Sequence, residues 1–182
     1  KGNDPNAKDN EGRTPAHLGT YHSSLAALSI LLKHPDVDPN VRDNEGRTAM
    51  HIAAARCLTG AAVHLIKNPR LNPDVADKEG FTPLHIACHK GHARVAQILV
   101  DAGAGVDQAK ENGVTPLYVA AHNGHLEVGL TLVEAGANVG RARENGNTPL
   151  IVAAQEGHLE VVHALVKAGG AIVNQTGNKG GN

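Results

Sequence analysis

One short phrase recurs five times along this 182-residue chain, and its spacing constrains the fold more than any other feature. The copies are TPAHLG from Thr14, TAMHIA from Thr48, TPLHIA from Thr82, TPLYVA from Thr115 and TPLIVA from Thr148. Successive threonines are 34, 34, 33 and 33 residues apart. A constant period in this range predicts an array of stacked units, because one unit cannot bury its apolar face alone. We therefore expect function to reside on a repetitive surface.

Each period predicts two short helices followed by a hairpin-like loop. In the third copy, Thr82 can cap a helix whose first residue is Pro83, where a missing N–H costs nothing. The first helices are expected to close on left-handed glycines at Gly91, Gly124 and Gly157. The second helices are expected to stop at Ala102-Gly103, Ala135-Gly136 and Gly169-Gly170. Helices this short are marginal alone in water, so each must pack against the neighbouring copy.

The third copy, DKEGFTPLHIACHKGHARVAQILVDAGAGVDQA from Asp77 to Ala109, resembles an ankyrin repeat. It contains D-x-x-G-x-T-P-L-H-x-A, G-H and L-x-x-A-G-A, and the resemblance covers residues 9 to 176. The resemblance implies an all-α ankyrin-repeat solenoid of about five helix-turn-helix repeats joined by hairpin-like loops. We expect one domain over residues 1–182, with repeats at 9–42, 43–76, 77–109, 110–142 and 143–176.

The two ends and the composition lead to further expectations. Residues 3–13 nearly duplicate residues 37–47, so we expect partial repeat hairpins at both ends and a fragment of a longer protein. The formal charge of -1 argues against a nucleic-acid partner. No run of apolar residues is long enough to span a membrane, so we expect no direct membrane insertion. Two cysteines do not make a disulfide framework, so we expect an intracellular protein, in the cytoplasm or the nucleus. We also expect a monomer.

One segment of the third copy has the spacing of a metal site. His85, Cys88, His89 and His92 stand at i, i+3, i+4 and i+7, which would gather zinc ligands on one helical face. However, Gly91 should end the helix before His92, and the repeat pattern explains His85 and His92 as hydrogen-bonding residues. The chain also has no G-x-S-x-G motif and no P-loop. We therefore expect no metal, no cofactor and no catalytic residue, and hence not an enzyme.

The resemblance implies a protein–protein interaction module that binds a partner protein or peptide on a concave face. This face is formed by the loop tips and the exposed side of the first helices. Its predicted contact residues are Arg13, Tyr21, His22, Arg47, Arg56, Lys78, Phe81, His89, Lys90, Val114, His122 and Asn147. Cations are concentrated in the first three repeats, so we expect attraction of an acidic partner segment. Phe81 is the only phenylalanine, and we expect it to lie exposed beside Arg47 and Arg56 as an interface hot spot.

Two alternatives remain open. The array could be a structural spacer or regulatory element within a larger enzyme, channel or effector. Asn40 could also be modified, because Leu32 and Asp38 precede it as in the motif of an asparaginyl-hydroxylase substrate of this family, although Pro39 departs from that motif. The second copy departs from the pattern in its own way: Cys57 stands where other copies have the glycine that ends the first helix. If Cys57 adopts the same left-handed conformation, the cost is about 1 kcal/mol.

Overall fold

The computed structural model describes residues 4–177, with side chains described as far as residue 169. Within this range it has ten helices and no strand, which confirms the all-α prediction. The chain divides into two compact units, Lys1–Gly105 and Val106–Asn182, hereafter unit 1 and unit 2. Each unit is an array of helix-turn-helix repeats.

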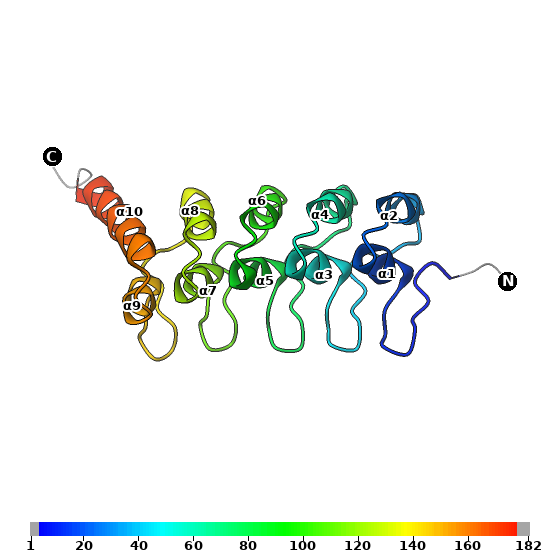
Figure 1. The fold of residues 1–182 in the computed structure, drawn as a ribbon, viewed down its shortest axis with the longest axis horizontal. Coiled ribbons are helices and arrows are strands. Elements are labelled where there is room, and N and C mark those ends of the chain that lie inside the picture. Colours follow the sequence, from blue (N-terminus) through cyan, green and yellow to red (C-terminus); the bar gives the residue numbers. More distant parts are fainter. Residues whose placement is uncertain (1–3, 178–182) are drawn as a thin grey trace. The chain divides into compact units, whose positions relative to one another are not determined.

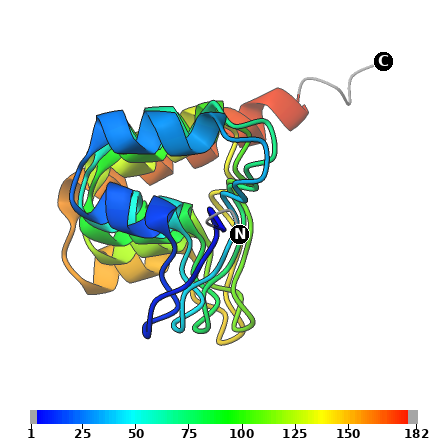
Figure 2. The same cartoon turned by 90° about the vertical axis from the view of Figure 1, so that its right-hand side faces the viewer.

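Unit 1 holds three pairs of antiparallel helices. They are α1 (Pro15–Tyr21), α2 (Leu25–Lys33), α3 (Ala49–Ala55), α4 (Thr59–Ile66), α5 (Pro83–Lys90) and α6 (Ala93–Asp101). The first helices pack side by side, α1 on α3 and α3 on α5, while α2, α4 and α6 form a second layer in the same order. Figure 2 shows the two layers edge-on, with the loops extending from the layer of first helices. We call this the inner layer and the other the outer layer.

Unit 2 repeats the arrangement with two pairs of helices. They are α7 (Pro116–His122), α8 (Leu126–Glu134), α9 (Pro149–Gln155) and α10 (Leu159–Gly177). Helix α7 packs on α9 in the inner layer, and α8 packs on α10 in the outer layer. The predicted stop at Gly169-Gly170 is wrong, because α10 continues to Gly177. Each glycine costs a helix only about 1 kcal/mol, and no proline follows to end it.

The repeated threonines start the inner helices as predicted. Thr82 is in extended conformation at the N-cap of α5, and its hydroxyl oxygen accepts from the backbone N–H of His85. Thr115 and Thr148 do the same for α7 and α9. Because each of these three threonines satisfies one N–H that the helix leaves unpaired, the phrase sets the starting point of α5, α7 and α9.

Left-handed residues end the inner helices. Gly91, Gly124 and Gly157 have φ of 72°, 73° and 76°, which confirms the three predicted glycine caps. The equivalent residues of the first two repeats, Ser23 and Cys57, both have φ of 56° although neither is glycine. The first helix of every repeat thus ends in a left-handed residue. This conformation strains Ser23 and Cys57, because each has a Cβ.

The core of each unit is a thin layer of leucine, alanine and valine. One leucine in each outer helix is almost completely buried: Leu28, Leu65, Leu99, Leu132 and Leu165. Alanines such as Ala53, Ala87 and Ala120 are fully buried in the inner helices, where their small size lets neighbouring helices approach closely. The loops also stack tightly. A Cβ on Gly46 would lie 2.8 Å from the backbone N of Lys78, so only glycine fits there.

Candidate partner-binding face

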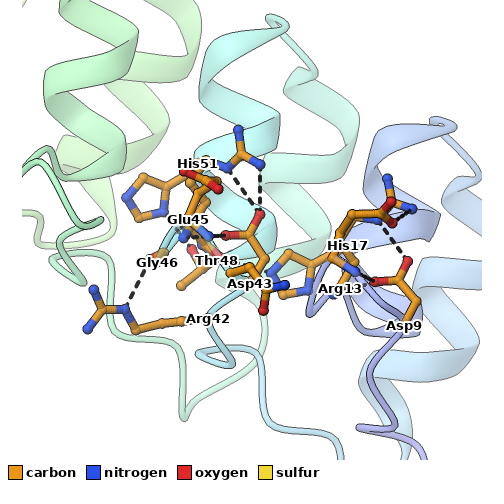
Figure 3. A network of polar contacts seen from close by, with 12 residues as sticks. Asp9, Arg13, His17, Arg42, Asp43, Glu45, Gly46, Thr48 and His51 are labelled. Atoms are coloured by element: carbon orange, nitrogen blue, oxygen red, sulfur yellow. Dashed lines mark hydrogen bonds and ion pairs between the residues drawn. The ribbon is translucent and has the colours of Figure 1, made fainter.

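The first two loops of unit 1 are each built around an aspartate–arginine pair. In the second repeat, Asp43 Oδ1 accepts the backbone N–H of Glu45 at 2.9 Å and that of Arg47 at 2.8 Å. Its Oδ2 accepts Nε of Arg47 at 3.0 Å (Figure 3). Asp9 and Arg13 repeat the pattern in the first loop, with Arg13 Nε donating to Asp9 Oδ2 at 2.8 Å. One carboxylate therefore shapes each turn and holds its arginine.

These pairs change the charge that the loops present. Desolvation by itself would raise the pKa of the Asp43 carboxyl, but hydrogen bonds from the backbone and side chain of Arg47 lower it overall. The pKa of Asp9 is lowered in the same way through Arg13, which also forms an ion pair with Glu11. Both aspartates are therefore ionised at neutral pH and offset the charge of their arginines.

Buried histidines connect α1 and α3 of unit 1 to the loop of the next repeat. The His17 Nδ1 atom accepts the backbone N–H of Thr14 at 3.1 Å, and its Nε2 donates to the carbonyl oxygen of Arg47 at 2.9 Å. His51 makes the same contacts with Thr48 and with the carbonyl oxygen of Phe81. These bonds orient the backbone at Arg47 and Phe81, two residues of the predicted binding face.

A cavity of about 420 Å³ lies between the second and third repeats on this face. Five of the predicted contact residues line it: Arg47, Lys78, Phe81, His89 and Lys90. Its wall also includes Ala55, Ile86 and the acidic side chains of Glu45, Asp77 and Glu79. Phe81 is only partly exposed, because its ring packs edge to face against the ring of His85, with the two ring centroids 6.0 Å apart. The aromatic thus forms part of a hollow and does not project from the surface.

A second, smaller hollow of about 190 Å³ lies between the first and second repeats. Arg13, Tyr21, Arg47 and Arg56 line it. The guanidinium of Arg56 lies over the ring of Tyr21, 4.5 Å from the ring centroid, and donates to the Tyr21 carbonyl oxygen. Arg47 lines both hollows, but Arg56 lines only this one. The expected trio of Phe81, Arg47 and Arg56 is therefore divided between two adjoining hollows.

The third loop differs from the first two in one informative way. Asp77 Oδ1 accepts the backbone N–H of Glu79 and Phe81, both at 2.9 Å, so the turn itself is the same. Phe81 occupies the position of Arg13 and Arg47, so this loop supplies no arginine to its aspartate. An apolar ring and a carboxylate replace an ion pair at this point of the cavity wall.

The remaining predicted residues lie apart from these two hollows. His22 caps α1 and its ring packs edge to face on Tyr21 at 5.2 Å. In unit 2, His122 Nδ1 lies 3.6 Å from Glu156 Oε1, and Asn147 Nδ2 lies 3.5 Å from Gln155 Oε1. Val114 is partly exposed in the loop before α7. Val114, His122 and Asn147 all belong to unit 2.

The amide of Asn40 links two successive loops. Its Nδ2 donates to the carbonyl oxygen of Arg70 at 2.7 Å, and its Oδ1 accepts the backbone N–H of Asn72 at 2.7 Å. Asn6 makes the equivalent bonds to Asp36 and Asp38 one repeat earlier. The asparagine is therefore accounted for by inter-repeat bonding, and its modification stays a prediction.

The segment with zinc-like spacing is folded into the helical core. Cys88 is fully buried, and burial raises the pKa of its thiol. His85 Nδ1 lies 2.9 Å from the Thr82 hydroxyl as part of the helix cap. Among the residues that the structure describes, no three histidine, cysteine or carboxylate side chains are grouped to hold a metal ion.

Sequence reasoning missed the apolar floor of the hollows and the stacking of Arg56 on Tyr21. Ile52 of α3 and Ile86 of α5 line the hollows from the inner helices. Ile52 and Ile86 each stand four residues after the capping threonine, a spacing that could have marked them. Nothing local signals the stacking, because its two partners are 35 residues apart in sequence.

The paired helices, the threonine caps and the stacked loops define a helix-turn-helix repeat protein. A family model described as ankyrin repeats (3 copies) matches residues 1–70 and 55–143, and one described as ankyrin repeat matches residues 145–178. The chain belongs to the ankyrin-repeat family. A comparison with curated proteins found no match.

Membership of the ankyrin-repeat family indicates a general role for the chain. Ankyrin repeats are generally protein–protein interaction modules, and proteins built from them are typically non-enzymatic. Between residues 4 and 177, no helix has both the length and the apolar character that crossing a membrane requires.

Proposed function

We propose that unit 1 binds a segment of a partner protein in the two adjoining hollows of its inner face. The observation that carries this proposal is the cavity of about 420 Å³ that brings Phe81 together with Arg47, Lys78, His89 and Lys90. An aromatic and an arginine in a recess are the kind of group that dominates binding energy at protein interfaces. The apolar wall of Ala55 and Ile86 suits an apolar anchor residue of the partner.

The charges around the cavity support a partner with acidic residues beside that anchor. Arg13 and Arg47 are offset by Asp9 and Asp43, so they contribute little net attraction. Lys78 and Lys90 have no ion pair among the described residues, and both are exposed. Glu45 and Glu79 lie on the same wall and limit the attraction. The two lysines are therefore the groups that would meet a carboxylate of the partner.

The first experiment compares the parent protein with Phe81→Ala as baits for affinity capture from the native source, with quantitative mass spectrometry. A partner of this site should be depleted on the variant, and its affinity should fall ten-fold or more, about 1.4 kcal/mol. Circular dichroism checks that the variant is folded. Equal capture by both baits would contradict the proposed site.

A charge reversal tests the acidic partner. Lys90→Glu should weaken binding more at low ionic strength than at high ionic strength, because salt screens the lost attraction. Lys67→Glu is the matched control, since Lys67 is an exposed lysine at the C-cap of the outer helix α4. The acidic-partner proposal fails if the two reversals have the same effect on binding.

A further inference from the structure

The outer surface of unit 2 carries an apolar groove that the proposed binding face does not use. Its volume is about 790 Å³, and it runs between α8 and α10. Leu126, Leu130 and Val133 line it from α8. Leu130 is 42% exposed, and Leu159, at the start of α10, is 74% exposed. Exposed leucines concentrated in one groove indicate a surface that is covered in use.

The repeat pattern does not account for Leu130. Leucine also stands at the position of Leu126 in the first repeat, at Leu25, so Leu126 follows the pattern. The position of Leu130, in contrast, is serine, valine and glutamine in the first three repeats, at Ser29, Val63 and Gln97. The outer helices of unit 1 therefore fold without a leucine at this place, and the exposed side chain of Leu130 is available for a contact outside the repeat.

Helix α10 contributes one continuous stripe to the groove. Its lining residues are Leu159, Glu160, His163, Ala164, Lys167 and Ala168. Their spacing of three or four residues places them on one face of the helix. Glu160 and Lys167 stand two turns apart, roughly 10 Å along the axis, and neither forms an ion pair within the residues that the structure describes.

This stripe is complementary to itself when reversed. Consider a two-fold axis that passes between His163 and Ala164. It would place the α10 of a second copy antiparallel to the first, and each residue of one helix would face a defined residue of the other. Glu160 would face Lys167, giving two ion pairs of opposite charge. His163 would face Ala164, and Leu159 would face Ala168, so each larger side chain meets a small one. All six lining residues of α10 fall into these three complementary pairs.

We propose that this groove is the interface of a symmetric dimer, in which α10 of each copy lies antiparallel in the groove of the other. Leu126 and Leu130 of α8 would then cover the side of the incoming helix. A two-fold interface requires one patch that complements itself, which is what the stripe provides. Glu160 and Lys167 lie equally far from the two-fold axis between His163 and Ala164, and binding of an unrelated partner would not require this. This proposal differs from the monomer expected from the sequence.

The first test measures the mass of the full chain in solution by sedimentation equilibrium over about 1 to 500 µM, a range that spans weak to moderate self-association. The parent should shift from monomer to dimer, and Leu159→Glu should remain a monomer over the whole range. Ile30→Glu is the control, because Ile30 is a 73% exposed apolar residue on the outer helix α2 of unit 1. It should dimerise like the parent. A parent that stays monomeric at every concentration overturns the proposal.

Charge reversals test the antiparallel register. Glu160→Lys alone and Lys167→Glu alone should each raise the dissociation constant of the dimer ten-fold or more, because each places like charges opposite one another. A mixture of the two single variants should form a heterodimer about as tight as the parent dimer, because lysines of one copy then face glutamates of the other. Unimpaired self-association of both variants, or no preference for the heterodimer, would rule out this register.

Discussion

The guanidinium of Arg56 lies over the ring of Tyr21, with Cζ 4.5 Å from the ring centroid. Arg56 caps α3 and Tyr21 ends α1, so this contact joins the ends of two neighbouring inner helices. Both residues line the smaller hollow of the proposed binding face. The stacking therefore joins two neighbouring repeats of unit 1 and fixes the place of a cation in the proposed binding face.

A double-mutant cycle should detect this contact. Tyr21→Leu and Arg56→Gln should be coupled by about 0.5 to 1 kcal/mol in the free energy of unfolding, the usual value of an exposed cation–π pair. Urea unfolding of the parent, the two single variants and the double variant provides the measurement. If the two effects simply add, the contact contributes nothing to stability.

The buried histidines predict that acid weakens unit 1 before unit 2. Desolvation lowers the pKa of His17 and His51 below the ordinary value of 6.5, because each ring is buried with Nδ1 facing a backbone N–H. The folded state therefore takes up a proton less readily than the unfolded chain. The two neutral histidines therefore contribute to the free energy of unfolding. This contribution is fully present above pH 6.5, and it is lost as the pH falls through the lower pKa of the folded state.

Unit 2 supplies the internal control for that prediction. Tyr118 and Ile151 occupy the position of His17 and His51, so α7 and α9 have no histidine in their caps. Hydrogen exchange at about pH 7.5 and about pH 5, expressed as opening free energies, should show a loss in α1 and α3 that α7 and α9 do not share. Equal losses in both units would contradict the role of the histidines.

Cys57 is strained, and its replacement by glycine should stabilise the protein. Its φ of 56° is costly for a residue with a Cβ, so Cys57→Gly should add about 1 kcal/mol to the free energy of unfolding. Thermal unfolding should show a rise in Tm of about 2 to 4 °C. Gly157→Ala is the matched control: its φ is 76° with no neighbouring atom within 4 Å, so it should lower Tm similarly. An unchanged or lower Tm for Cys57→Gly would mean that the turn fits cysteine without strain.

The two loop aspartates should differ in their effect on stability. Asp43 is 6% exposed and accepts from two backbone N–H groups and from the Arg47 side chain. Asp43→Ala should therefore cost about 2 to 3 kcal/mol, because it leaves these donors without their acceptor. Within the described part of the chain, Asp77 accepts the two backbone N–H groups and no side chain, so Asp77→Ala should cost about half as much. Equal losses in chemical denaturation would show that the arginine adds nothing.

The sequence by itself determined the repeat unit. The period of the threonine phrase predicted the helix pairs, and Thr82 and Gly91 marked the start and end of an inner helix correctly. It also identified Cys57 as the residue at the position of a left-handed glycine, and the structure gives it a φ of 56°. These features depend on residues within one turn of helix of each other, where capping and backbone sterics act.

Only the tertiary structure decided how the side chains of different repeats combine. Arg56 lies on Tyr21 and not beside Phe81, because the partner of a long, flexible side chain depends on what the neighbouring repeat places opposite it. Arg13 and Arg47 are offset by carboxylates of their own loops, which a count of charges along the chain does not reveal. The groove between α8 and α10 likewise exists only once two outer helices are packed together. Local propensity sets the elements of this fold, and contacts between repeats set its surfaces.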